Sequence, residues 1–153
     1  MEDSLIRSTL TQGLPALGLG EELIPQLTEF SRLLLEKNQV MNLTAITEPR
    51  EVATLHLLDS LSLAPREDLS GRRIIDVGTG AGFPGVPLAI ALPESEVTLL
   101  DSLGKRVSFL AEVREALGLG NVVCVHARAE EFAAAHRETY DAVVSRAVAA
   151  LPV

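Results

Sequence analysis

The spacing of apolar residues changes near residue 70 of the chain. Before that point, apolar side chains recur every three or four residues, which is the pattern of a helix that buries one face. One series predicts an amphipathic helix of about four turns and consists of Leu23, Leu27, Phe30, Leu33 and Leu34. A second helix is expected to begin near Glu48-Pro49 and to end at Pro65, with an apolar face formed by Val52, Leu55, Leu58 and Leu61. We therefore predict that residues 1–70 form an N-terminal helical subdomain.

After residue 70, short apolar runs alternate with helical patterns. Strands are expected at residues 74–77, 97–100, 122–125 and 140–145, and helices at residues 84–92, 105–117 and 129–135. Short apolar strands that alternate with helices are typical of a parallel sheet covered by helices on both faces. The predicted fold class is therefore α/β, with a doubly wound sheet in residues 71–153.

Composition is that of one globular protein, with 153 residues, of which 47% are hydrophobic and 22% are charged. No apolar run approaches the roughly 18 residues of a membrane span, and the N-terminus has no signal-peptide pattern. Cys124 is the only cysteine, which excludes an internal disulfide framework and suits a reducing cytoplasm. We therefore expect a cytoplasmic protein without a membrane segment.

The net charge of −8 restricts how the chain could bind a nucleic acid. RNA phosphates are bound by clustered Lys and Arg side chains, so an acidic protein can bind RNA only through a local basic surface. The candidates for such a surface are Lys105-Arg106, Arg72-Arg73 and Arg146.

A glycine-rich segment joins the first predicted strand to the helix that follows it. Residues 76–85 have the sequence Asp-Val-Gly-Thr-Gly-Ala-Gly-Phe-Pro-Gly. Glycines permit a tight turn and let a ligand lie directly on the backbone, and open α/β sheets bind ligands at this end of their strands. The spacing also satisfies the dinucleotide-binding pattern, so the loop alone leaves two cofactor classes open.

Asp76 distinguishes these two classes. A pyrophosphate binds to backbone N–H groups at a helix N-terminus, and a carboxylate beside it would be repulsive. S-adenosylmethionine has no phosphate and carries a sulfonium and an ammonium, both of which an acidic strand end would attract. Asp76 therefore favours S-adenosylmethionine as the ligand of the loop that contains Gly78 and Gly80, although its side chain could instead cap the loop through backbone N–H groups.

Two further acidic residues follow the next predicted strands. Asp101 lies 21 residues after Gly80, close to the spacing at which an acidic residue reaches a ribose hydroxyl, although it could instead cap the next helix. Glu130 would border a nucleoside pocket or complement a helix dipole. His56 and His126 have no partners at metal-ligand spacing, so no metal is predicted.

Six segments occur in an order that resembles a known enzyme family, the glucose-inhibited division protein B family of guanine-N7 methyltransferases of small-subunit (16S) ribosomal RNA. The segments are Met41 to Ile46, His56 to Leu61, Asp76 to Ile90, Leu100 to Arg106, Arg128-Ala129-Glu130 and Val144 to Ala147. The resemblance implies a Rossmann-like S-adenosylmethionine-dependent methyltransferase sheet. It also implies a monomeric cytoplasmic enzyme that acts on 16S ribosomal RNA or on the small ribosomal subunit.

The resemblance also implies site residues. The family's cofactor contacts fall on Gly78, Phe83, Ala129, Glu130 and Arg146. Phe83 could instead be core between helices, and Arg146 could be a structural ion pair or a residue that positions the guanine. No general base is expected, because guanine N7 carries a free lone pair and no proton.

Two alternatives to a methyltransferase stay open at this point, an NAD-dependent oxidoreductase and a non-catalytic nucleoside-binding module. Members of the family continue beyond the fourth strand with further strands and helices. We therefore expect residues 71–153 to represent only the first four strands of the methyltransferase core, with the C-terminal part absent.

Overall fold

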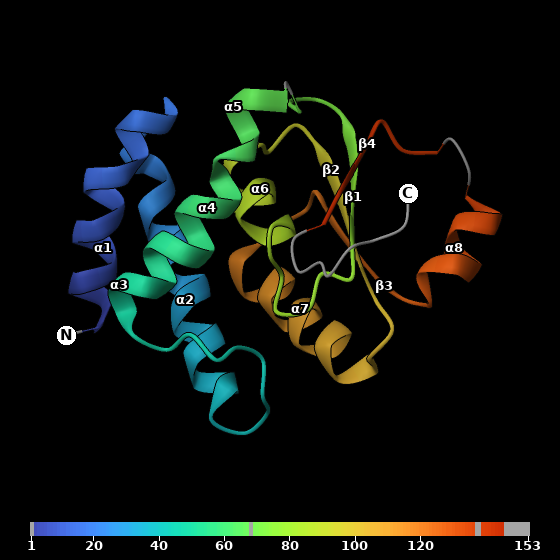
Figure 1. Cartoon of the computed structure of the whole chain (residues 1–153), viewed down its shortest axis with the longest axis horizontal. Coiled ribbons are helices and arrows are strands. Elements are labelled where there is room, and N and C mark those ends of the chain that lie inside the picture. Colours follow the sequence, from blue (N-terminus) through green and yellow to red (C-terminus); the bar gives the residue numbers. More distant parts are fainter. Residues whose placement is uncertain (1, 68, 137–138, 146–153) are drawn as a thin grey trace.

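Four parallel strands lie side by side at the centre of the molecule, in the order β3-β2-β1-β4 (Figure 1). The computed structural model describes residues 2–67, 69–136 and 139–145. The strands are β1 (Arg73–Val77), β2 (Glu96–Asp101), β3 (Val122–His126) and β4 (Ala142–Val144). Each overlaps a predicted strand. Asp76 of β1 pairs in register with Leu99 of β2 and Val144 of β4.

The order of the strands places a change of direction between β1 and β4. The chain moves outward from β1 to β2 and β3, and then returns across the sheet so that β4 pairs with β1. In open α/β sheets, ligands bind outside the carboxyl ends of the strands at such a point. The fold therefore brings the loops after the strands to the expected binding edge.

Helices cover both faces of the sheet, as predicted. Helices α6 (Gly85–Ala91) and α7 (Gly104–Leu117) lie on one face, and α8 (Ala129–Ala135) lies on the other (Figure 1). Right-handed crossovers produce this arrangement, because the connection from β3 to β4 runs opposite to the two connections before it. Helix α7 is capped by Gly118, whose left-handed φ of 64° turns the chain so that the Leu119 N–H donates to the carbonyl of Arg114 at 3.0 Å.

The N-terminal residues form a helical layer on the outer side of α6 and α7 (Figure 1). The two long helices of this layer are α1 (Glu2–Gly13), which the hydrophobic pattern did not indicate, and α2 (Ile24–Asn38), which it did. The shorter elements are η1 (Leu14–Leu17), η2 (Glu21–Leu23), α3 (Pro49–Glu51), η3 (Val52–Leu58), α4 (Asp59–Leu61) and α5 (Leu63–Glu67). A continuous set of buried side chains joins the layer to the α/β part and includes Phe30, Leu61, Val86 and Leu110.

The helical segment over residues 49–61 differs in detail from the prediction. Glu48 caps its start, because its Oε2 accepts a hydrogen bond from the Glu51 N–H at 2.9 Å. The middle part, η3, is a π-helix, and its wider turn shifts side chains away from α-helical spacing. Leu55 is consequently 47% exposed, whereas His56 and Leu57 are buried. The predicted apolar face is therefore wrong at Leu55.

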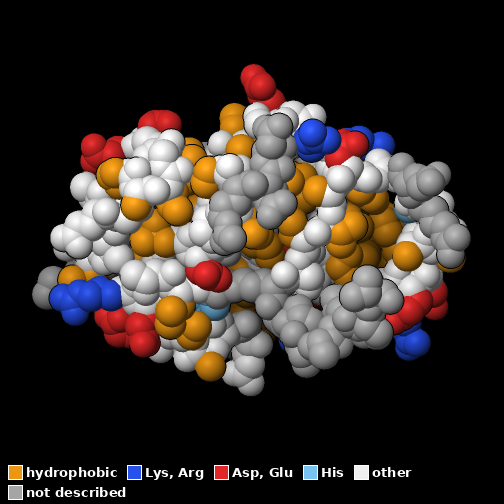
Figure 2. Space-filling view, turned by 45° about the horizontal axis from the view of Figure 1, so that its top comes forward, with side chains coloured by type: hydrophobic (Ala, Val, Ile, Leu, Met, Phe, Trp, Pro, Cys, Tyr) orange, Lys and Arg blue, Asp and Glu red, His pale blue; other side chains and the backbone are white. Residues whose placement is uncertain are grey.

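The surface carries charges of both signs. On the face shown in Figure 2, the Lys and Arg side chains stand apart from one another and do not gather into one basic patch. No helix among the described residues combines the length and the apolar character that crossing a bilayer requires.

Candidate functional site

The turn between β1 and α6 is bonded to the end of β2. The N–H groups of Gly78 and Thr79 donate to the carbonyl of Leu100 at 2.9 and 3.0 Å. Gly78 and Gly80 have φ values of 68° and 59°, in the left-handed region that glycine adopts without strain. Among the described residues, no other heavy atom lies within 4 Å of the place that a Cβ would take at either glycine. We call residues 78–85 the glycine turn; it presents bare backbone beside the ends of β1 and β2.

Asp76 lies beneath the glycine turn with its side chain fully buried. Its Oδ2 accepts hydrogen bonds from Thr79 Oγ1 at 2.6 Å and from the Gly85 N–H at 2.8 Å. These bonds join β1, the turn and the start of α6. The geometry thus gives Asp76 the loop-capping role that was the alternative to direct cofactor contact.

Asp101, at the end of β2, is 3% exposed. Its Oδ2 accepts a hydrogen bond from the Gly80 N–H at 2.9 Å, and its Oδ1 accepts one from the Leu103 N–H at 2.9 Å. Arg106 Nη1 lies 3.6 Å from Oδ1. A carboxylate oxygen can accept more than one hydrogen bond. Asp101 therefore caps the start of the next segment and fixes Gly80, while it keeps acceptor capacity for a hydroxyl group.

A cavity of about 460 Å³ opens where β1, β2 and β3 end. We call it the edge cavity; its lining comprises Val77, Gly78, Leu100, Asp101, Ser102, Ala127, Arg128, Ala129 and Glu130. Four of the predicted cofactor residues, from three separate segments, meet here: Gly78 after β1, Asp101 at the end of β2, and Ala129 and Glu130 at the start of α8. The sequence analysis did not assign three of the lining residues to the site: Ser102, Ala127 and Arg128. Their position shortly after β2 and β3 could have indicated that they line it. The charged side chains of the lining are Asp101, Arg128 and Glu130, and Asp101 is paired from outside the lining by Arg106.

Phe83 packs away from the edge cavity, into the helical layer. It is 6% exposed, and its ring stacks on His56 with ring centres 4.2 Å apart and an angle of 7° between the planes. Phe30 of α2 also contacts it, at a ring-centre distance of 5.3 Å. This geometry agrees with the core-packing alternative for Phe83. Arg146 lies outside the described residues, so its predicted roles stay predictions.

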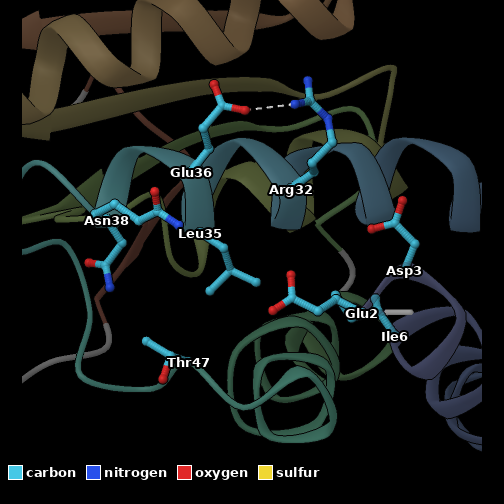
Figure 3. Close-up of a pocket in the computed structure, with 9 residues that line it drawn as sticks. Glu2, Asp3, Ile6, Arg32, Leu35, Glu36, Asn38 and Thr47 are labelled. Carbon is cyan, nitrogen blue, oxygen red and sulfur yellow. Dashed lines mark hydrogen bonds and ion pairs between the residues drawn. The ribbon is translucent and has the colours of Figure 1, made fainter.

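A larger polar cavity, of about 670 Å³, lies in the helical layer (Figure 3). Its lining comprises Glu2, Asp3, Ile6, Arg32, Leu35, Glu36, Asn38, Gln39 and Thr47, and contains no predicted site residue. Arg32, the basic side chain of this lining, pairs with Glu36 at 2.9 Å and with Glu29 at 2.7 Å. The hydrogen bonds from Arg32 lower the pKa of Glu29. Because its cation is already paired, this cavity is a poorer candidate than the edge cavity.

Metal chemistry and nucleophilic catalysis have little support in the part of the chain that the structure describes. Within residues 2–67, 69–136 and 139–145, no group of three or more His, Cys, Asp or Glu side chains is placed to hold a metal ion. Burial raises the pKa of the Cys124 thiol, which keeps it protonated at neutral pH. Ser145 Oγ donates to the carbonyl of Val77 at 3.1 Å. The site is therefore suited to binding and positioning.

A family model described as rRNA small subunit methyltransferase G (GidB) matches residues 23–153. Curated relatives named Ribosomal RNA small subunit methyltransferase G are similar over most of the chain. The relative from Alkaliphilus metalliredigens (strain QYMF) is 50% identical over 100% of this chain and 65% of its own length. The relative from Alkaliphilus oremlandii (strain OhILAs) is 57% identical over 85% of this chain and 56% of its own length. The matched regions thus cover between 56% and 65% of the length of these relatives.

Solved methyltransferase structures share the fold at low sequence identity. A protein-L-isoaspartate O-methyltransferase superposes with a TM-score of 0.55 at 14% identity, over 95% of this chain and 47% of that one. Coclaurine N-methyltransferase bound to N-methylheliamine and SAH superposes with a TM-score of 0.53 at 20% identity, over 94% of this chain and 48% of that one. These likenesses confirm the predicted fold class.

Proposed function

Because the chain belongs to the rRNA small subunit methyltransferase G family, we propose that the whole enzyme transfers a methyl group from S-adenosylmethionine to guanine N7 of 16S ribosomal RNA. The observation that carries the proposal is the edge cavity, where Gly78, Asp101, Ala129 and Glu130 meet at the carboxyl edge of the sheet. Within this chain, the edge cavity is the proposed cofactor site.

The chemistry of the edge cavity fits a cationic nucleoside. S-adenosylmethionine carries a sulfonium, an ammonium, a ribose and an adenine, but no phosphate. Asp101 can accept a ribose hydroxyl, and Glu130 adds a second carboxylate to the lining. Gly78 leaves the backbone open to a ligand, since no heavy atom of the described residues lies within 4 Å of its Cβ position.

Family membership counts against the NAD-dependent alternative, whereas Asp101 does not distinguish the two cofactors, because an acidic residue at the end of the second strand also binds the ribose of NAD. Within the edge cavity, the carboxylate of Glu130 would repel a diphosphate at short range. Asp76 no longer carries this argument by direct contact, since it is buried beneath the turn. The selection by charge that we predicted from Asp76 is therefore proposed to come from Glu130.

Methylation of guanine N7 requires little acid–base chemistry from the protein. The ring nitrogen has a lone pair and no proton, so no general base has to be found among the side chains. When bound, S-adenosylmethionine supplies the methyl group as an electrophile. The protein then has to align the two reactants and exclude water. Asp101 and the glycine turn are proposed to fix the nucleoside, and Arg146 is proposed to position the guanine.

The RNA has to be recognised locally, because the chain has a net charge of −8. Two of the predicted basic residues are already engaged: Arg73 pairs with Glu96 at 3.3 Å and lies over the ring of Tyr140, and Arg106 has an acidic partner at 3.6 Å. Lys105 is exposed at the start of α7. We propose that Lys105 contributes a phosphate contact, in a monomeric cytoplasmic enzyme that binds 16S ribosomal RNA or the small subunit.

Methyl transfer can be tested by incubating the whole enzyme with labelled S-adenosylmethionine and small ribosomal subunits that lack the modification, with free 16S RNA as the comparison substrate. The expected result is label at a guanine that becomes sensitive to borohydride reduction and aniline cleavage, as N7-methylguanine does. Label on an exocyclic amine or a ribose hydroxyl, with no cleavable guanine, would contradict the N7 assignment. Cofactor binding without transfer to either substrate would instead favour the nucleoside-binding module.

A further inference from the structure

His56 joins the glycine turn to a loop for which the proposed function has no role. Its ring stacks on Phe83 of the glycine turn, and its Nε2 lies 2.8 Å from Thr44 Oγ1. His56 is 8% exposed and Phe83 is 6% exposed, so neither ring can move without repacking of its neighbours. A line of direct contacts therefore runs from Thr44 through His56 to the glycine turn.

Thr44 belongs to a loop of residues 41–48 that follows α2, which we call the 41–48 loop. Asn38, at the end of α2, accepts the N–H groups of Leu43 and Thr44 at 2.8 and 2.9 Å through its Oδ1. Thr44 Oγ1 in turn accepts the Ile46 N–H at 3.0 Å. The loop also borders the polar cavity, to which Asn38 and Thr47 both contribute (Figure 3). The loop is thus fixed on the side that faces His56.

The π-helix explains why His56 lies between the loop and the glycine turn. Element η3 buries Val52, Ala53, His56 and Leu57, and leaves Leu55 exposed. An α-helical period would have turned Leu55 inward, as the sequence pattern predicted. π-turns are rare and occur frequently at functional sites. The irregular turn therefore places a polar aromatic ring where it can contact both partners.

Phe83 can transmit a displacement to the rest of the glycine turn. The N–H groups of Phe83 and Gly82 both donate to the carbonyl of Thr79, at 3.2 and 2.9 Å. Thr79 in turn is bonded to Asp76 beneath the turn. A shift of the Phe83 ring therefore acts on the backbone that carries Gly78 and Gly80.

We propose that His56 is a positioning residue that couples the 41–48 loop to the glycine turn, so that the order of the loop sets the affinity of the edge cavity. The physical coupling is independent of any ligand, while its effect on affinity rests on the proposed function. Coupling between two sites is reciprocal. Occupation of the edge cavity therefore stabilises the 41–48 loop in return.

The ligand-free chain tests the coupling through amide hydrogen exchange measured by NMR. Thr44→Val removes the hydroxyl that bonds His56 and keeps the branched shape. It also removes the acceptor of the Ile46 N–H, within the loop. Because the contact with His56 is the one that leads to the glycine turn, exchange at the amides of Gly82, Phe83 and Gly85 should become about 2- to 10-fold faster. Thr54→Val is the matched control, because its hydroxyl bonds only the Arg50 carbonyl of its own helix at 2.9 Å. It should leave the glycine turn unchanged.

Two further variants separate coupling from simple loss of stability. Thr44→Ser keeps the hydroxyl and should restore exchange in the turn. His56→Phe keeps the stacked ring without the hydrogen bond to Thr44, so it should also speed exchange in the glycine turn, and the effect of the double variant should be smaller than the sum of the two single effects. The coupling would be overturned if the effects of the two substitutions on amide exchange were additive. It would also be overturned if the amides of the glycine turn exchanged at the wild-type rate in Thr44→Val.

The effect on affinity is measured with S-adenosylhomocysteine in the same proteins. In the wild type, ligand should slow exchange at the Leu43 and Thr44 amides, and Thr44→Val should weaken binding about 2- to 10-fold. A wild-type chain that binds no ligand counts against the proposed function, while the ligand-free exchange data still decide the coupling. Wild-type binding with unchanged affinity in Thr44→Val would overturn the claim that the loop sets affinity.

Discussion

Asp101 and Glu130 reach the edge cavity from different elements and contribute to it in different ways. Asp101 is almost fully buried and accepts the N–H groups of Gly80 and Leu103, so its loss would disturb the turn as well as the charge. Glu130 is exposed in the first turn of α8, where its carboxylate can be neutralised without breaking a described hydrogen bond. Glu130 is therefore the cleaner probe of the charge of the cavity.

Neutralising Glu130 should weaken the binding of a cationic nucleoside. We expect Glu130→Gln to reduce the affinity for S-adenosylmethionine about 5-fold, the effect of one charge at a few ångströms in a solvated site. Glu131→Gln is the matched control, because Glu131 is the next residue of α8, is also exposed and is not among the residues that line the cavity. Calorimetric titration with S-adenosylmethionine measures the affinity of both variants. Equal effects of the two substitutions would mean that Glu130 acts only through the net charge of the protein.

At the scale of elements, the strands and helices of residues 71–153 could be predicted because their signals are local. The range predicted for α8 agrees with the structure, and α7 begins one residue before its predicted start. The elements of the helical layer were harder to predict from the sequence. Its helix α1 has few apolar positions, and η3 departs from α-helical spacing in a way that periodicity does not reveal.

In the site, too, the sequence predicted what depends on local signals and missed what depends on tertiary packing. Gly78, Asp101, Ala129 and Glu130 follow strands, and a parallel sheet brings the ends of its strands together, so sequence position was sufficient to group them. Side-chain direction was not accessible in this way. Asp76 faces beneath the turn, and Phe83 faces His56, which precedes it by 27 residues. Those orientations depend on how the helical layer packs against the α/β part.

The glycine turn, as an element, should tolerate a side chain poorly at Gly82. Its φ is 107°, and a Cβ there would lie 2.8 Å from Val86 Cγ2 and 2.9 Å from Leu110 Cδ2. We expect Gly82→Ala to lower the free energy of unfolding by about 1–3 kcal/mol, from backbone strain and overpacking. Gly120→Ala is the control, since a Cβ at Gly120 meets no described atom within 4 Å. Urea denaturation measures both, and equal stability of the two variants would contradict the geometry.

The whole molecule places its helical layer on the outer side of α6 and α7, where it does not cover the carboxyl ends of the strands (Figure 1). The described residues of this layer do not line the edge cavity, while the glycine turn that borders the cavity is packed from behind by Phe30 and His56. With a net charge of −8, the chain is expected to contact RNA through a few basic side chains.

The selection of a cationic nucleoside over a diphosphate is tested most directly by titrating the chain with S-adenosylmethionine and with NAD under the same conditions. Amide chemical shifts recorded in each titration identify the residues that respond. We predict saturable binding of S-adenosylmethionine, with chemical-shift changes at the amides of Gly78, Asp101 and Ala129. NAD should cause no shift changes of comparable size. Binding of NAD at those residues, with no response to S-adenosylmethionine, would contradict it.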